Sequence, residues 1–525
     1  MWLHVRRERL LQVWLLAGVI GVAVGYGVLL FRYLIGAVQW LWLGTEAENI
    51  VATKAGSLHW LIVLLAPVVG GLVVGLMLVS IAERRRASGV ADVIESVHLR
   101  HGAISWRDGL ASAVITVVSL GSGASAGREG PAVHIGAALA SQLQRPLRLP
   151  VKARRVLLAA GAASAVSASF NAPLAGMLFA HEVILGHYAM SSFVPTVLAA
   201  VAGTLVTRVH LGDFPAFILP PHEIASYLEM PLFLVLGLLA GLVAVAFLRA
   251  VELADDAARR IVMPLWLRPV AGGAVIGLMG VFIPEILGVG YEATSQALRG
   301  NYGLWFLLVL LAAKMVATAV TLASRFGGGV FAPALFLGAM LGGAFGMVAG
   351  MALPQVVSSP SVYALVGTSA VAGAVMGAPL STALIVFEMT GGYKMTIALL
   401  LAASVAAVVM QLLVGRSFFH WQLARRGLEL DSGPHRRIMR LMTVGDFMIP
   451  REKGESTKLS PPFDARPALR KDDTLEKALR TFNEGGYSRL AVVDRAGRLM
   501  GWADYAQALE TFNRAMIEAA EEEHK

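Results

Sequence analysis

The chain has 525 residues and a formal net charge of +9, with 56% hydrophobic and only 15% charged residues. Soluble domains carry roughly 25% charged residues, so this composition excludes an ordinary soluble protein. The chain has no cysteine, which excludes disulfides and thiolate metal sites.

The first apolar tract covers residues 10–43. It is too long for the apolar core of a signal peptide and lacks a clear small-residue cleavage site, so we expect it to remain as the first membrane helix. Arg6, Arg7 and Arg9 precede it, and the positive-inside tendency predicts a cytoplasmic N-terminus. Arginines between residues 425 and 440 predict the same side for the C-terminus. The number of membrane crossings is then even.

Further apolar tracts recur along the chain, and crossing a bilayer takes about 20 apolar residues in a helix. They include residues 58–82, 230–248, 304–323 and 399–414. Charged residues concentrate at the end, with 31 in the 93 residues of 433–525 against 48 in the preceding 432. We therefore predict a membrane domain over residues 1–432 and a soluble tail over residues 433–525. The positive flanks account for the net charge and indicate no nucleic-acid partner.

The segment 87–91, Ala-Ser-Gly-Val-Ala, follows a basic stretch at residues 84–86 that marks a cytoplasmic edge. Ser88 is typical of a helix N-cap. Its hydroxyl is equally suited to donate to an anion from the inner side. Both interpretations stay open.

The segment 127–131, Gly-Arg-Glu-Gly-Pro, lies between two apolar stretches. A carboxylate at the centre of a membrane helix costs about 2.5 to 3.5 kcal/mol, so Glu129 calls for an explanation. Pro131 suits the first turn of a helix, and the glycines allow close approach of a ligand. A helix that begins here offers free N–H groups and a positive dipole end to an anion. We interpret Glu129 as a gate that leaves this site when protonated or displaced; the alternative is a cap or a salt bridge to Arg128.

Two blocks of sequence recur in the same order. Pro-Ala-Val-His-Ile-Gly-Ala at 131–137 is echoed by Pro-Ala-Leu-Phe-Leu-Gly-Ala at 333–339, an offset of 202. Ala-Pro-Leu at 172–174 followed by Glu182 is echoed by Ala-Pro-Leu at 378–380 followed by Glu388, an offset of 206. Small-residue membrane helices resemble one another by composition alone, but the shared order favours a true repeat. We predict repeats at about 10–212 and 229–425, with a substrate site between them near the bilayer midplane.

The second repeat supplies its own glycine-rich helix start at 327–333, Gly-Gly-Gly-Val-Phe-Ala-Pro. Two helix N-termini can therefore converge from the two halves. A chloride ion has no orientation to recognise, so weakly held backbone N–H groups and hydroxyls suffice to bind it and allow its release.

In the tail, Thr474 precedes an amphipathic helix with Ala478, Leu479 and Phe482 on one side. An alternating run at 489–494 then ends at a turn, as a strand and hairpin would. The acidic residues at 518–523 indicate a solvated helix or a frayed end.

Together these segments resemble the CLC family of chloride channels and Cl⁻/H⁺ antiporters. The family signatures are Gly-Ser-Gly-Ile-Pro, Gly-Lys/Arg-Glu-Gly-Pro and Gly-x-Phe-x-Pro; the second and third match at 127–131 and 329–333, and 170–176 and 388–390 extend the likeness. The resemblance implies an all-α polytopic membrane protein built from inverted repeats with broken helices. It also implies a homodimer with one anion pathway in each subunit, in a bacterial inner membrane. The tail resembles a single CBS motif, a small α/β domain, ending at 501–504.

The resemblance assigns roles to particular residues. Glu129 is the gating glutamate, and a serine at the inner site favours chloride over fluoride. The anion-binding positions are Ser88, Gly130, Val330, Phe331 and Phe419. No metal and no cofactor are implied. Adenine-nucleotide binding by the tail is conceivable, but Ala503 replaces the Thr or Ser that often precedes the phosphate-contacting aspartate, which argues against it.

Three positions depart from the family pattern. The first signature is degenerate at 87–91, which weakens the assignment of Ser88. Phe419 stands where the family has a tyrosine, so the inner gate lacks a hydroxyl donor. Val183 stands where many antiporters carry a proton-relaying glutamate, and we therefore predict a channel-like protein, with an antiporter using another proton route as the alternative. The matching positions of Glu182 and Glu388 favour a structural role for both.

Other interpretations concern single residues. The run 181–187, His-Glu-Val-Ile-Leu-Gly-His, is similar to the His-Glu-x-x-His zinc motif of intramembrane proteases, some of which also carry CBS domains. That motif needs histidines four residues apart, whereas here they are six apart and Leu185 occupies the required position, so we reject the protease interpretation. We assign no role to His134. Lys314 is an intramembrane basic residue that either lies near the anion path, snorkels to the surface or pairs with a glutamate.

Overall fold

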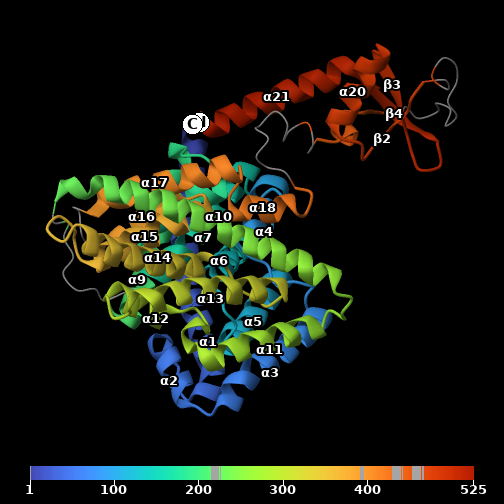
Figure 1. Cartoon of the computed structure of the whole chain (residues 1–525). Helices are drawn as coiled ribbons and strands as arrows, with labels where there is room; N and C mark the ends of the chain where they lie inside the picture. Colours follow the sequence, from blue (N-terminus) through green and yellow to red (C-terminus); the bar gives the residue numbers. More distant parts are fainter. Residues whose placement is uncertain are drawn as a thin grey trace. The chain divides into compact units, whose positions relative to one another are not determined.

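The structure is a computed structural model that describes residues 2–213, 224, 226–390, 395–428, 439, 442–451, 463 and 466–524. Its contacts divide the chain into two compact units, Met1–Gln422 and Leu423–Lys525, called here the membrane unit and the tail unit (Figure 1). The predicted boundary between residues 432 and 433 lies outside the described residues.

The regular elements among the described residues of the membrane unit are all helices, which confirms the predicted all-α class. One helix, α8, continues into a π-helical turn, η3. The last helix, α18, spans the border between the two units. The elements are α1 (Trp2–Leu43), α2 (Val51–Ser57), α3 (Trp60–Ser80), α4 (Val90–Leu99), α5 (Trp106–Gly121), α6 (Glu129–Gln144), α7 (Val151–Phe170), α8 (Pro173–Phe179), η3 (Ala180–Leu185), α9 (Met190–Leu211), α10 (Met230–Arg260), α11 (Leu267–Phe282), α12 (Tyr291–Leu298), α13 (Leu304–Ala323), α14 (Phe331–Ala352), α15 (Pro360–Met376), α16 (Pro379–Thr390), α17 (Thr396–Leu413) and α18 (Phe418–Ala424).

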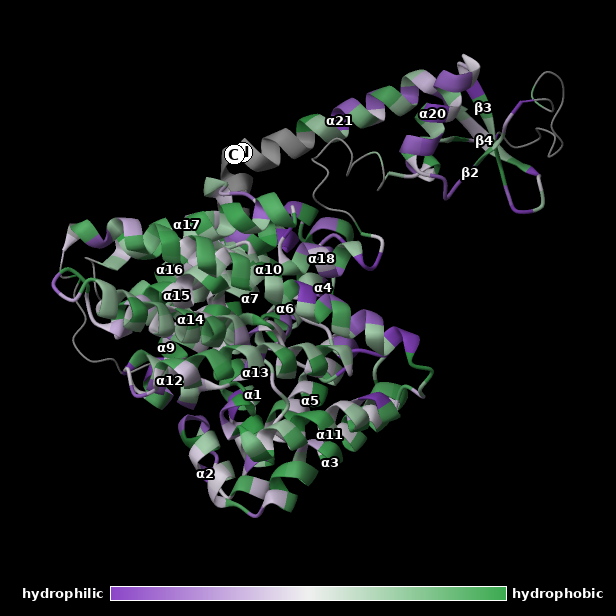
Figure 2. Cartoon of the chain, viewed as in Figure 1, coloured by the Kyte–Doolittle hydropathy of each residue, from purple (hydrophilic) through white to green (hydrophobic). Residues whose placement is uncertain are grey.

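The helices suit a bilayer in length and in the placement of apolar side chains. Among the described residues, seven are long and apolar enough to cross a membrane, and shorter apolar helices accompany them. Large apolar side chains face outward, for example Leu15 on α1, Leu76 on α3 and Leu242 on α10, each more than half exposed. Figure 2 shows apolar residues running along most of these helices. Because the shorter helices also count toward the crossings, the even number stays a prediction.

The predicted repeat appears in the packing of the helices. In the first half α6 packs on α7, and α7 packs on α9; in the second half α14 packs on α15, and α15 packs on α17. Equivalent helices also touch each other across the two halves, as α3 touches α11 and α8 touches α16. Contacts between equivalent elements are what a two-fold relation between the halves produces.

Glycines allow the equivalent helix pairs to approach closely. A Cβ built on Gly136 of α6 would lie 2.5 Å from the carbonyl oxygen of Gly161 on α7, and the reverse distance is also 2.5 Å. In the second half, a Cβ on Gly338 would lie 2.2 Å from the carbonyl oxygen of Gly367, and the reverse distance is 2.4 Å. Small residues at such crossings let helix backbones pack directly in a membrane. The same device thus builds both halves.

The tail unit contains a four-stranded sheet flanked by helices. The sheet order is β1-β4-β3-β2; β2 runs parallel to β3, while β4 runs antiparallel to β3 and β1. Helix α20 begins where predicted, with Thr474 as its N-cap, and Leu475, Ala478 and Phe482 are buried in the core of the unit. The predicted strand and hairpin appear as β3 and β4. The elements are β1 (Ile449–Pro450), β2 (Leu469–Arg470), α20 (Leu475–Gly485), β3 (Arg489–Val493), β4 (Leu499–Asp504) and α21 (Tyr505–His524), the last of which includes the acidic end.

Candidate functional site

Two helices begin side by side inside the membrane unit. Gly127 and Gly329 form a reciprocal pair of backbone hydrogen bonds, each 2.7 Å from nitrogen to oxygen. Helix α6 begins two residues after Gly127, and α14 begins two residues after Gly329. A Cβ built on Gly130 would lie only 3.3 Å from the Cα of Gly329. The two helix starts predicted from the sequence therefore converge, as expected.

The local sequence explains why both helices start here. Pro131 and Pro333 occupy the first turn of their helices, where a missing N–H costs no helical hydrogen bond. The N–H groups of Ala132 and Ala334 donate to the carbonyl oxygens of Arg128 and Val330. The N–H groups that precede Pro131 and Pro333 in the first turn of each helix therefore have no acceptor within their own helix. Such free donors, at the positive end of each helix dipole, form a site for an anion.

Glu129 stands at the first position of α6, with a side chain that is 1% exposed. Its Oε1 accepts a hydrogen bond of 2.5 Å from the hydroxyl of Tyr291, the first residue of α12. Its Oε2 is buried and has no hydrogen-bond partner among the described residues. A buried carboxylate oxygen without a donor is costly, and it marks a group that belongs with a further ligand or with a change of position.

Arg128, the neighbour of Glu129, forms its ion pair with Glu48. Its guanidinium binds the carboxylate of Glu48 and lies 5.1 Å from the centre of the Tyr291 ring. The alternative of a salt bridge between Arg128 and Glu129 is therefore not formed among the described residues. Glu48 also lies 3.9 Å from Nε of Arg32 on α1, so one carboxylate faces two guanidinium groups.

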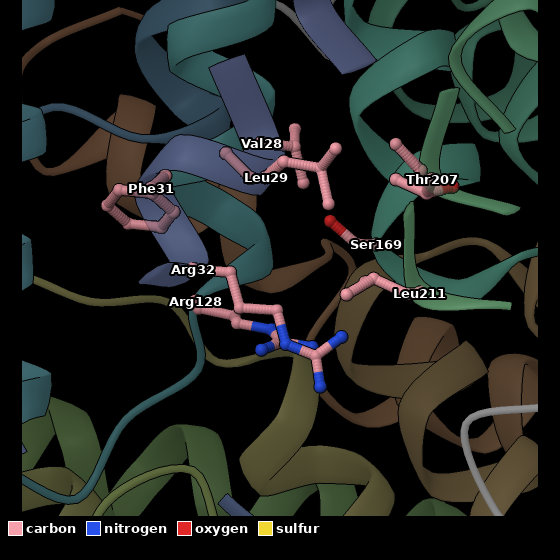
Figure 3. Close-up of a pocket in the computed structure, with 10 residues that line it drawn as sticks. Val28, Leu29, Phe31, Arg32, Arg128, Ser169, Thr207 and Leu211 are labelled. Atoms are coloured by element: carbon pink, nitrogen blue, oxygen red, sulfur yellow. The ribbon is translucent and has the colours of Figure 1, made fainter. Parts of the chain in front are cut away.

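Both arginines line a small cavity of about 10 Å³, enough for about one water molecule. Figure 3 shows Arg32 and Arg128 at one side of this cavity, with apolar side chains of α1 and the hydroxyl residues Ser169 and Thr207 around the rest. The two guanidinium groups outnumber the single carboxylate of Glu48. The cavity therefore carries a positive balance next to the residue that precedes Glu129.

Ser88 lies before α4, but it is not the cap of that helix. The cap is Gly89, whose N–H donates to the carboxylate of Asp92 at 3.0 Å, so the N-cap interpretation of Ser88 is wrong. The hydroxyl of Ser88 is buried and has no partner among the described residues. Val90, two residues on, has its Cγ2 3.9 Å from a Cβ built on Gly130. Ser88 thus lies on a segment that reaches the start of α6 and presents an unused hydroxyl.

The sequence matches a family over most of the membrane unit. Residues 70–411 match the model of the voltage gated chloride channel family, the CLC proteins. The chain belongs to this family. Residues 460–511 match the CBS domain, which confirms the prediction for the tail.

Individual relatives agree with this assignment. A ClcB-like chloride channel protein of Ralstonia nicotianae is 34% identical over 415 residues, covering 78% of this chain and 96% of the relative. The H⁺/Cl⁻ exchange transporter ClcA of Vibrio cholerae is 34% identical over 318 residues, covering 59% of this chain and 68% of the relative. A solved structure of a slow cyanobacterial Cl⁻/H⁺ antiporter shares the fold with a TM-score of 0.71 at 22% identity, covering 79% of this chain and 97% of that chain.

The remaining predicted CLC anion positions lie in the second half. Val330, the N-cap of α14, is 1% exposed, and the ring of Phe331 packs between Phe170 and Phe179 at centroid distances of 4.9 and 6.3 Å. Phe419 is buried on α18 with its ring edge-on to that of Phe418, 6.1 Å away. Helix bounds and packing bring Gly130, Val330 and Phe331 together, whereas the link of Phe419 to this site rests on the resemblance.

Glu182 and Glu388 each cap a helix of the other repeat. The carboxylate of Glu182 accepts hydrogen bonds from the N–H groups of Leu380 and Ser381 at the start of α16, at 3.1 and 2.8 Å. The carboxylate of Glu388 accepts from the N–H groups of residues 174 and 175 at the start of α8, at 3.0 and 2.8 Å. These bonds confirm the structural role expected for both glutamates. Val183, the next residue on η3, is buried.

The histidines of the rejected protease motif bind backbone groups. Nδ1 of His181 contacts the carbonyl oxygen of His187 at 3.0 Å, and Nδ1 of His187 accepts from the N–H of Ala189 at 3.3 Å. The CLC assignment accounts for the membrane unit without a protease. His134 is buried on α6, and its Nδ1 has no hydrogen-bond partner among the described residues.

Lys314 neither snorkels nor pairs with a glutamate among the described residues, and its placement near the anion path stays a prediction. It is fully buried, so it does not snorkel, and no carboxylate among the described residues forms a salt bridge with it. Its Nζ donates to the carbonyl oxygens of Ile286 and Gly288 instead, at 2.9 Å each.

Sequence reasoning missed Tyr291 and Glu48, the partners of Glu129 and Arg128. A signal for Tyr291 existed in the repeat, because shifting the segment 87–91 by the offset of 202 gives 289–293. Glu48 has no such signal, since it lies 80 residues from Arg128 in a short helical turn.

Proposed function

We propose that this CLC protein carries chloride across the membrane through a pathway gated by the carboxylate of Glu129. The observation that carries the proposal is the position of this carboxylate, buried where two helix N-termini meet and holding one oxygen without a donor. A chloride ion and the carboxylate need the same donors, so they compete for one place. Protonation removes the charge of the carboxylate, and with it the attraction to the N–H donors at the two helix N-termini.

The surrounding groups support an anion rather than a larger solute. The N–H groups near Gly130, Val330 and Phe331 supply donors without a full positive charge, and the hydroxyl of Ser88 adds one more. Weak sites of this kind bind an ion and still release it, which transport requires. The name of the ClcB-like relative supports chloride as the anion.

We favour a channel-like protein over a coupled exchanger. The decisive residue is Val183, a buried apolar side chain that cannot carry a proton. Its neighbour Glu182 is engaged in capping α16 and does not replace the missing relay. The second candidate is an antiporter with another proton route, which the exchangers among the relatives favour.

One flux measurement separates the two candidates. The full chain is reconstituted in liposomes with a chloride gradient and no proton gradient, and the internal pH is followed. A channel leaves the pH unchanged once the membrane potential is clamped. Proton movement driven uphill by chloride would establish the antiporter and overturn the channel preference.

The gate itself is tested with Glu129→Gln, which imitates the protonated side chain. We expect chloride flux to persist and to lose its dependence on pH. Glu388→Gln is the matched control, because it removes a carboxylate charge from the same unit at a helix cap, and its flux should keep the pH response. A Glu129→Gln variant with the pH response of the unmodified protein would remove Glu129 from the gating role.

The family supports a proposal for the assembly and placement. We expect a homodimer with one pathway in each subunit, in a bacterial inner membrane and with both termini in the cytoplasm. In the tail unit, Asp504 is bound by the guanidinium of Arg489 through two hydrogen bonds of 2.5 and 2.9 Å. An aspartate engaged in this way, preceded by Ala503, favours a tail that acts without an adenine nucleotide.

A further inference from the structure

Tyr291 contacts the gating carboxylate directly. Its hydroxyl donates to Oε1 of Glu129 at 2.5 Å, and the two residues are 162 positions apart in the chain. Tyr291 opens α12, which occupies in the second half the place that α4 holds in the first. A residue from one repeat therefore holds the charged residue of the other repeat.

The segment before Tyr291 is held in place by Lys314. Nζ of Lys314 donates to the carbonyl oxygens of Ile286 and Gly288, at 2.9 Å each. The N–H of Gly288 in turn donates to the carbonyl oxygen of Gly123 at 3.2 Å, close to the start of α6. The chain between residues 286 and 290 is thus bound on two sides.

The packing at Gly290 leaves little freedom for this segment. Gly290 has a φ of +90°, which glycine adopts without strain. A Cβ built on it would lie 2.8 Å from the ring of Phe336 and 3.2 Å from Nζ of Lys314. Lys314 therefore touches the backbone that sets the position of Tyr291.

In the first repeat, a hydroxyl group at the position equivalent to Lys314 binds the corresponding segment. Ser112 lies 202 residues before Lys314, the offset of the repeat, and its hydroxyl oxygen accepts from the N–H of Ser88 at 2.9 Å. Each repeat thus uses one side chain, on α5 or α13, to bind the segment that enters α4 or α12. In the second repeat Gly290 stands at the position of Ser88, and Tyr291 follows it directly.

We propose that Tyr291 is a latch that holds the ionised Glu129 in the closed position, and that Lys314 positions the latch by binding residues 286–288. The proposal rests on the gating role of Glu129. A hydrogen bond to an ionised carboxylate is roughly twice as strong as one between neutral groups. The latch therefore stabilises the closed gate at high pH and weakens when Glu129 takes up a proton.

Tyr291→Phe tests the latch, since it keeps the ring and removes only the hydroxyl. The closed state loses a charge-assisted hydrogen bond, so we expect the pH of half-maximal chloride flux to rise by about one unit, which corresponds to about tenfold in proton concentration. Tyr363→Phe is the matched control, because Tyr363 donates to the buried Glu229 at 2.7 Å away from the helix starts. An unchanged midpoint in Tyr291→Phe, or an equal shift in Tyr363→Phe, would overturn the latch.

Lys314→Met tests the positioning role. We expect the same upward shift, and we expect the double variant with Tyr291→Phe to shift no further than Tyr291→Phe alone, because both changes act on one bond. Additive shifts would mean that Lys314 acts on the anion directly and would refute its role through Tyr291. If Lys314→Met does not fold, Gly290→Ala displaces the same segment and is measured in its place, with the same expectation.

Measurements on Glu129→Gln distinguish a failure of the proposed latch from a failure of the proposed gating role. If Glu129→Gln abolishes the pH response and Tyr291→Phe leaves the midpoint unchanged, the gate stands and the latch fails. If Glu129→Gln retains the pH response, the gate fails and the latch fails with it. In the expected case, adding Tyr291→Phe to Glu129→Gln changes nothing further.

Discussion

The first half of the membrane unit begins α6 with Glu129 directly after Arg128, whereas the second half begins α14 with Phe331 directly after Val330. The backbones at the two places are alike, since Gly127 and Gly329 exchange equivalent hydrogen bonds. The comparison teaches that the shared backbone creates the donors for an anion, while the side chains of one half alone add the charged residue. The symmetric backbone builds the paired helix starts, and under the proposed gating role of Glu129 the departure from symmetry makes the pathway respond to pH.

The largest effect should come from breaking the packing that both halves share. Gly136→Val and Gly338→Val each place atoms against a backbone carbonyl, and we expect either change to abolish the single monodisperse peak of the purified protein in size-exclusion chromatography. Gly18→Val and Gly350→Val are the controls, because a Cβ at these positions meets no atom within 4 Å. Survival of only one of the two packing variants would show that the halves do not depend equally on this contact.

A second test gives the second half the charge of the first. Val330→Glu places a carboxylate at the start of α14, where it competes with the anion, and we expect chloride flux at pH 7 to fall by about tenfold and to recover on acidification. A factor of ten corresponds to about 1.4 kcal/mol. Val330→Gln has nearly the same volume without the charge and should show no such recovery. Equal behaviour of the two variants would mean that size rather than charge controls flux here.

The helix caps formed by Glu182 and Glu388 should contribute about equally to stability, and their loss should have a smaller effect than the two changes above. Glu182→Ala and Glu388→Ala each leave two N–H groups at a helix start without an acceptor, and we expect each to lower the free energy of unfolding by about 1–2 kcal/mol. Thermal unfolding of the purified protein measures the loss, and the pH dependence of flux serves as the control. If Glu182→Ala alone changes that pH dependence, Glu182 takes part in proton movement and the two halves differ at this place too.

The smallest effect is expected from Ser88→Ala. The hydroxyl has no protein partner among the described residues, so thermal stability should not fall, while the chloride concentration for half-maximal flux should rise about threefold, as for one neutral hydrogen bond. Ser80→Ala, which removes an exposed hydroxyl on α3, should change neither quantity. An unchanged chloride dependence in Ser88→Ala would leave the site to the backbone donors alone.

The repeat and the two helix starts could be predicted because they are written in local sequence. Gly127, Pro131 and their counterparts report backbone geometry directly, and a constant offset of 202 or 206 residues needs no knowledge of contacts. The structural role of the capping glutamates could also be predicted, since Glu182 and Glu388 each lie nine residues after matching prolines. The cap of α4 was misplaced by one residue, because the competition between Ser88 and Gly89 was decided by the carboxylate of Asp92.

By itself the sequence determined the membrane-helix class, the duplicated architecture, the buried glutamate at a helix start and the CBS tail, since apolar length, glycine and proline positions and internal likeness are local properties. Only the tertiary structure decided the partners: Tyr291 on Glu129, Glu48 on Arg128 and Lys314 on the carbonyls of residues 286 and 288. A buried polar group binds whichever partner folding brings within about 3 Å. The repeat offset points to the segment that holds Tyr291, but no pattern along the chain specifies which two side chains meet.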